Sequence, residues 1–126
     1  MDQAVILSTA RTAIGKAYRG SFNDTDAPTL ASHAIKASIN KSGVEPDEIE
    51  DVIMGAAVQQ GTQGYNIGRL SAIASGLPSQ VPGMSVDRQC ASGLMAIAIG
   101  AKQIACKEMD VVVAVSYTHL TLPTKA

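Results

Sequence analysis

Four short runs of apolar and β-branched residues alternate along the chain with three longer segments in which apolar residues recur at helical spacing. The runs span residues 4–7, 51–58, 81–86 and 110–115. This alternation is typical of an α/β fold with a mainly parallel sheet and crossover helices. The runs are apolar nearly throughout, so we expect four inner strands of one sheet, the first three being parallel neighbours or near neighbours.

The helical segments are predicted at residues 29–42, 66–75 and 91–106. Pro28 lies near the start of the first and Gly43 just past its end, while Gly76 and Pro78 follow the second, as helix boundaries prefer. Each of these two segments carries one apolar stripe, which predicts a helix that is buried on one face.

The third helical segment differs because apolar residues surround its axis. A helix of this kind has to be covered on every side, whereas a small two-layer domain covers a helix on one side only. We therefore expect residues 91–106 to form the most buried helix. A partner subunit or a further domain is expected over the face that the sheet leaves open.

Composition narrows the possible functions. The 126 residues, 46% hydrophobic and 17% charged, are enough for one compact domain. Ten Lys and Arg balance eleven Asp and Glu without a basic stripe, which argues against a nucleic acid partner. No stretch has the length and apolarity of a membrane span or a secretory signal. The two cysteines form neither a CxxC motif nor a disulfide framework, which favours a reducing compartment, by default the cytoplasm.

Cys90 is the candidate for chemistry, because it lies between the extended run 81–86 and the start of the third helix. A thiol at a helix amino terminus faces unpaired N–H groups and the positive end of the helix dipole, which favour the thiolate. A free cysteine is more commonly a small buried hydrophobe, and position alone leaves both interpretations open. Ser92 and Gly93 would let a substrate approach the backbone, or would serve helix packing.

Residues 87–94, DRQCASGL, followed by an Ala/Ile-rich helix and DVVVA at 110–114, resemble the active-site block of thiolases. RTAIGK at 11–16, VIMGAAVQ at 52–59 and GLP at 76–78 support this resemblance, which covers residues 1–114. It implies a thiolase-like amino-terminal α/β domain that is half of the family fold. Asp87 stands where many relatives have Asn, and Ala13-Ile14 replaces the more usual Pro-Phe.

The resemblance implies that Cys90 accepts the acyl group of a 3-ketoacyl-CoA, that acetyl-CoA leaves, and that coenzyme A then takes up the acyl chain. The reverse steps give condensation, so the parent enzyme belongs to fatty-acid breakdown or short-chain synthesis. Coenzyme A thioesters are then substrates and partners, with no bound cofactor and no metal. The acidic run 47–51 lacks ligand spacing. The full-length parent is expected to be a homo-oligomer, a dimer or a tetramer.

An activated cysteine also needs a general base, and the chain offers only His33 and His119. His33 falls on a solvated helix face, and His119 lies near the end of the chain. Thiolases resemble one another in taking their activating histidine and a second cysteine from later segments, so this chain is expected to be inactive alone. Cys106 does not match that second cysteine and is interpreted as structural. Arg11, Lys16 and Arg69 are expected to cap helices or to lie in solvent rather than to bind a phosphate.

The resemblance stops abruptly after DVVVA, where thiolases usually continue with a glycine pair and a Glu-Ser-Met run. This chain reads VSYTHLTLPTKA, so we expect a thiolase domain at residues 1–114 and a foreign tail at 115–126. Two alternatives remain for the function. One is a noncatalytic assembly module that docks through the apolar third helix, and the other is a related condensing enzyme such as a ketoacyl synthase.

Overall fold

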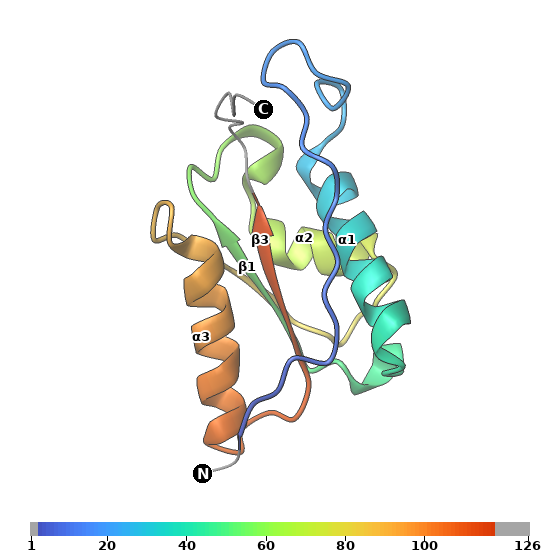
Figure 1. Cartoon of the computed structure of the whole chain (residues 1–126), viewed down its shortest axis with the longest axis vertical. Coiled ribbons are helices and arrows are strands. Elements are labelled where there is room, and N and C mark those ends of the chain that lie inside the picture. Colours follow the sequence, from blue (N-terminus) through green and yellow to red (C-terminus); the bar gives the residue numbers. More distant parts are fainter. Residues whose placement is uncertain (1–2, 118–126) are drawn as a thin grey trace.

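A three-stranded parallel sheet lies between two layers of helices in the computed structural model, which describes residues 3–117 (Figure 1). The strand order is β2-β1-β3. Helices α1 and α2 cover one face of the sheet and α3 covers the other. In chain order the elements are α1 (Ala27–Ser42), β1 (Asp51–Ala56), α2 (Ile67–Ala74), β2 (Gly83–Val86), α3 (Ser92–Ala105) and β3 (Val112–Tyr117), with short 3-10 turns at Pro46–Glu48 and Gly61–Gln63. The predicted α/β class is confirmed.

Strand β1 is the centre of the molecule, since all six of its residues are buried. It pairs with β2 in the register Val52↔Gly83 and with β3 in the register Val52↔Val113. Its side chains alternate between the two faces, as a strand requires. Val52 and Met54 join the clusters under α1 and α2, while Ile53 lies near Gly100 of α3.

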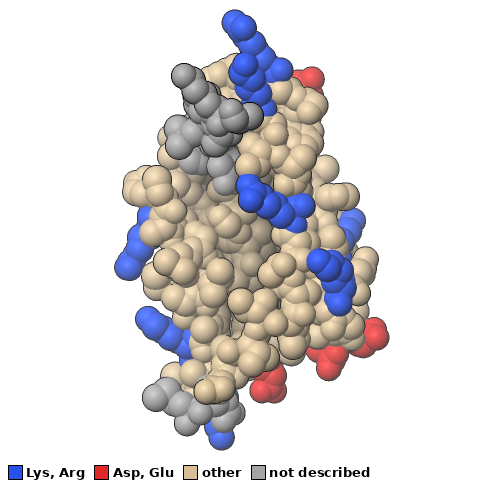
Figure 2. Space-filling model, in the orientation of Figure 1, with Lys and Arg blue, Asp and Glu red and all other residues tan. Residues whose placement is uncertain are grey.

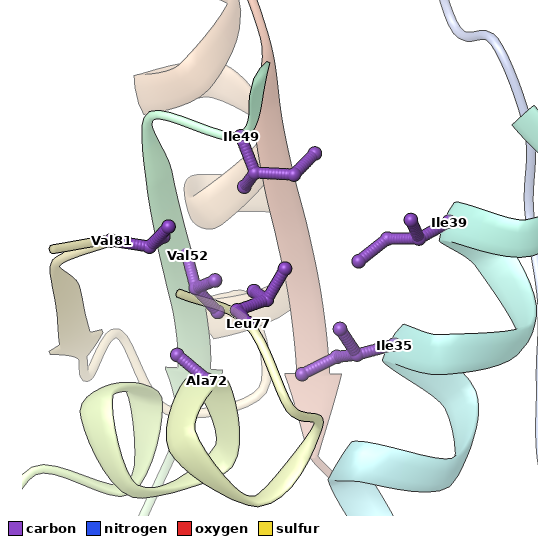
Figure 3. Close-up of a cluster of buried hydrophobic side chains, with 7 residues drawn as sticks. All are labelled: Ile35, Ile39, Ile49, Val52, Ala72, Leu77 and Val81. Atoms are coloured by element: carbon purple, nitrogen blue, oxygen red, sulfur yellow. The ribbon is translucent and has the colours of Figure 1, made fainter. Parts of the chain in front are cut away.

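The larger core cluster brings together aliphatic side chains from α1, α2, β1 and the segments that flank β1 and β2, and they point toward one another in Figure 3. Burial of a Leu, Ile or Val side chain is worth about 1.5–3 kcal/mol each relative to exposure, so this aliphatic cluster supplies a large share of the stability. Its members are Ile35, Ile39, Ile49, Val52, Ala72, Leu77 and Val81.

The predicted first strand, residues 4–7, is wrong in the described structure. The segment runs along the molecule outside the sheet, and Val5, Ile6 and Leu7 are exposed (Figure 1). It is tied instead to α1, where the Ser8 hydroxyl donates to the Ser38 carbonyl at 2.7 Å and Lys41 Nζ donates to the Thr9 carbonyl at 2.8 Å. An apolar run becomes a strand only when a neighbouring strand pairs with its backbone, and among the described residues none does.

The burial predicted for the third helix is also wrong for this chain. In α3 the buried residues are Ser92, Ala96 and Gly100, while Leu94 and Ile97 are 73% and 50% exposed. The cause is geometric, because one layer of sheet can cover only one side of a helix. The deduction that the sheet leaves an apolar face of this helix open is confirmed. The expectation of four inner strands holds only for β1, since β2 and β3 are edge strands.

Strand β3 crosses the predicted domain boundary at residue 114. Val115, Ser116 and Tyr117 continue the strand and pair with Met54, Gly55 and Ala56 of β1. The segment predicted as a tail therefore begins within strand β3. Residues 118–126, including His119, lie outside the described residues.

Candidate active site

Cys90 is exposed and lies in the connection between β2 and α3, four residues after Val86 and two before Ser92. The helix cap is Ala91, whose side chain offers no capping hydrogen bond. The thiol thus stands at the amino terminus of a fourteen-residue helix, as the sequence predicts. This end of a helix attracts negative charge.

The backbone just before Cys90 has an uncommon conformation. Gln89 has φ 48°, in the left-handed region that costs a non-glycine residue roughly 1–2 kcal/mol. Three side-chain hydrogen bonds hold it there. The Gln89 N–H donates to Asp87 Oδ1 at 2.9 Å, the Arg88 N–H donates to Ser92 Oγ at 2.8 Å, and the Ser92 hydroxyl donates to the Gln89 carbonyl at 2.6 Å.

Close backbone contacts fix the first turn of α3 against the sheet. A Cβ added at Gly55 of β1 would collide with the Ser92 carbonyl oxygen. A Cβ added at Gly93 would lie 2.6 Å from Ser116 Oγ of β3. Only glycine allows such approaches. Ser92 is buried with its hydroxyl engaged, so it serves this packing, and the alternative that it lets a substrate approach the backbone is not supported.

An open hollow of about 390 Å³ adjoins the thiol, and we call it the Cys90 hollow. It lies between α3 and the carboxyl end of β3, and Leu94 and Ile97 contribute its exposed apolar surface. The residues that line it are Cys90, Gly93, Leu94, Ile97, Ala114, Val115 and Ser116. Cys90 alone among them has an ionisable side chain. The hollow offers a nucleophile and an apolar surface, and no acid or base.

The other residues considered from the sequence lie away from this hollow. His33 is exposed on α1, across the sheet from α3. Cys106 is exposed at the carboxyl end of α3. The Arg69 guanidinium donates to the backbone carbonyls of Val81 at 2.5 Å and Ser79 at 2.9 Å. These hydrogen bonds give Arg69 a structural role.

A larger groove of about 690 Å³ separates the extended segment before α1 from α1 and β3. Arg11 and Lys16 line it, and neither Cys90 nor Cys106 does. Lys and Arg side chains are scattered over the face shown in Figure 2 and do not gather into one patch. No helix among residues 3–117 is long and apolar enough to cross a membrane.

The sequence matches the family model of the thiolase amino-terminal domain over residues 4–125. The chain belongs to the thiolase family. It is 41% identical over 114 residues to the acetyl-CoA acetyltransferase of Cupriavidus necator, an alignment that covers 90% of this chain and 28% of the relative. It is 37% identical over 114 residues to the 3-ketoacyl-CoA thiolase of Bacillus subtilis, with coverage of 90% and 29%.

Solved structures of thiolases share the fold. The acetyl-CoA acetyltransferase of Bacillus anthracis superposes with a TM-score of 0.86 at 34% identity, over 92% of this chain and 29% of that one. A thiolase from Ascaris suum in complex with coenzyme A gives the same score at 30% identity, over 91% and 30%. This thiolase domain therefore spans less than a third of the length of the relatives it matches.

Proposed function

We propose that this chain is the nucleophile-bearing part of a thiolase that transfers acyl groups between Cys90 and coenzyme A. The observation that carries the proposal is the position of Cys90, exposed at the amino terminus of α3 and beside an apolar hollow. Relatives named acetyl-CoA acetyltransferase and 3-ketoacyl-CoA thiolase support it. The solved thiolase in complex with coenzyme A supports coenzyme A thioesters as the substrates.

In the proposed reaction the Cys90 thiolate attacks the 3-keto carbon of a 3-ketoacyl-CoA. The C2–C3 bond breaks, the acyl group stays on sulfur as a thioester, and the leaving carbanion takes up a proton to become acetyl-CoA. The thiol of a second coenzyme A gives up its proton and attacks the thioester, which releases acyl-CoA and regenerates Cys90. The backbone N–H of Cys90 is a donor for the oxyanion in both steps.

These proton transfers need an acid and a base, and no residue lining the Cys90 hollow supplies one besides Cys90 itself. We therefore propose that the activating groups come from the part of the parent enzyme beyond this chain, and that the chain alone is inactive. We further propose a homo-oligomeric parent. Two free, exposed thiols fit a reducing compartment, for which we propose the cytoplasm.

Initial-rate kinetics of the intact parent enzyme test this function. The concentration of acetoacetyl-CoA is varied at several fixed concentrations of coenzyme A. A reaction through an acyl-enzyme intermediate then gives parallel lines in a double-reciprocal plot. The present chain, assayed at equal concentration as the matched control, is expected to leave acetoacetyl-CoA unchanged. Intersecting lines, or thiolysis by the chain alone, would contradict the proposal.

We also propose that residues 115–126 are foreign to the thiolase gene, because a glycine pair is usual in the family where Val115 and Ser116 stand. The family match itself extends to residue 125, so the gene sequence decides between the two. Resequencing intact genomic DNA tests this. A glycine pair and a Glu-Ser-Met run after Ala114 would support it. The same tail, in frame and followed by a stop codon, would refute it.

A further inference from the structure

Two polar side chains beside Cys90 do not line its hollow. Ser92 and Asp87 are absent from the lining, yet all three side-chain hydrogen bonds on the segment Arg88-Gln89 come from them. Neither side chain contributes to the surface of the hollow. They act on the backbone that leads directly into Cys90.

We infer that Ser92 and Asp87 are positioning residues that hold Gln89 in its left-handed conformation and so direct the Cys90 thiol into the hollow. This inference rests on the proposed role of Cys90 as the nucleophile. Ser92 bonds to the segment at both ends, accepting from the Arg88 N–H and donating to the Gln89 carbonyl. Asp87 secures the N–H of Gln89 between those two bonds.

The exposure of the two side chains indicates which of them contributes more to holding Gln89 in its conformation. Ser92 is 4% exposed, so water cannot replace its hydrogen bonds when the hydroxyl is removed. Its backbone is held against Gly55 of β1, which gives the turn a fixed anchor. Asp87 is exposed, and water competes for the Gln89 N–H. Loss of the Ser92 hydroxyl should therefore have the larger effect.

Alkylation of the full chain with iodoacetamide measures the position of the thiol without any need for turnover. Tryptic cleavage after Arg88, Lys102 and Lys107 places Cys90 in the peptide of residues 89–102 and Cys106 in that of residues 103–107. Mass spectrometry then gives both rates from one sample. Cys106, exposed on the same helix, reports general accessibility and unfolding.

Ser92→Ala is expected to slow alkylation of Cys90 roughly tenfold relative to Cys106, the size expected for the loss of one or two net hydrogen bonds. Ser92→Thr keeps the hydroxyl and should restore the ratio to within about twofold. Ser71→Ala is the matched control. Ser71 is a buried serine of α2 whose hydroxyl has no partner among the described residues, so its removal should leave the ratio unchanged.

Asp87 gives a second pair of variants. Because this residue lies on the surface of the protein, both variants are expected to fold normally. Asp87→Ala is expected to slow Cys90 by about two- to threefold, whereas Asp87→Asn keeps an acceptor oxygen and should match the wild type. An unchanged ratio in both Ser92→Ala and Asp87→Ala would overturn the inference. So would equal slowing of Cys90 and Cys106, which indicates a loss of folding alone.

The same data separate this inference from the proposed function. If wild-type Cys90 reacts no faster than Cys106, the proposed nucleophile is contradicted, whatever the variants do. If wild-type Cys90 is fast and the variants keep its rate, only the positioning roles fail.

Discussion

The two ends of α3 each carry an exposed free cysteine, and the backbone around them differs. At the amino end, Cys90 follows a left-handed residue, is flanked by three side-chain hydrogen bonds on the preceding turn, and adjoins a hollow. At the carboxyl end, Cys106 is the helix C-cap, with φ −85° and ψ 0°, and its N–H donates to the Lys102 carbonyl at 2.9 Å. The residue that follows it, Lys107, has φ 62°. It lines neither of the two cavities described above.

This comparison shows that exposure does not identify a nucleophile. Both thiols are accessible, but one stands where backbone dipoles favour negative charge and the other where carbonyl groups oppose it. A left-handed residue adjoins each cysteine, Gln89 before Cys90 and Lys107 after Cys106, so a positive φ does not distinguish the two ends either. At the amino end, the hydrogen bonds of Ser92 and Asp87 hold this conformation.

Serine substitution of each cysteine in the intact parent enzyme gives the largest expected difference. Cys90→Ser should lower kcat by roughly a thousandfold or more, because a hydroxyl is far harder to ionise than a thiol. Cys106→Ser, the matched control on the same helix, should keep turnover within about twofold. Steady-state thiolysis of acetoacetyl-CoA measures both, and comparable losses in the two variants would remove the distinction between the ends.

Glycine substitutions test whether the amino end is held more tightly than the rest of the helix. Gly55→Ala should destabilise the fold by about 2–3 kcal/mol, since its new Cβ collides with the Ser92 carbonyl. Gly100→Ala meets only ordinary contacts, the nearest with Val112 at 3.5 Å, and should stabilise α3 by about 0.5–1 kcal/mol. Urea unfolding of the two variants side by side gives both values, and a stable Gly55→Ala protein would show that the first turn can move.

Asp51 at the start of β1 provides a pH-dependent test distant from Cys90 in sequence. Burial raises the pKa of its carboxyl above the ordinary 3.8, although a hydrogen bond from the Val52 N–H partly offsets this. The folded state therefore holds the proton more tightly, and stability falls as pH rises from 3.8 through the raised pKa. At neutral pH Asp51→Asn should stabilise the protein, because the amide carries no charge to bury.

The gain from Asp51→Asn should disappear well below pH 3.8, where both states are protonated. Denaturation curves at neutral and acid pH measure it, and a gain of equal size at both would show that charge is not the cause. Alkylation of Cys90 should be unchanged in this variant.

The sequence predicted the elements whose patterns are local. Helices α1 and α2 lie within two residues of their predicted bounds because Pro28, Gly43 and Gly76 mark their ends, and three of the four apolar runs are strands. The strand predicted at residues 4–7 was wrong because strand pairing depends on a neighbour that is distant in the sequence, and no local pattern reveals it. The predicted burial of α3 was wrong for a related reason. Its apolar pattern requires a second covering layer, and residues 3–117 do not supply one.

The site was predicted only in part. The elbow at Cys90 followed from its place between an apolar run and a helix, and the resemblance to thiolases is confirmed by the family match. The hydrogen bonds of Ser92 and Asp87 were missed, because a serine or an aspartate in a turn has many possible partners. Gly55 was missed because its contact with Ser92 joins residues 37 positions apart.

The most direct test of the central claim is mass spectrometry of the intact parent enzyme after brief exposure to acetoacetyl-CoA without added coenzyme A. Rapid acid quenching preserves a thioester, and the tryptic peptides carrying Cys90 and Cys106 are compared in the same sample. The account predicts an acetyl group on the peptide of residues 89–102 that disappears when coenzyme A is added before quenching. An acetyl group on the peptide of residues 103–107, or on neither, would contradict it.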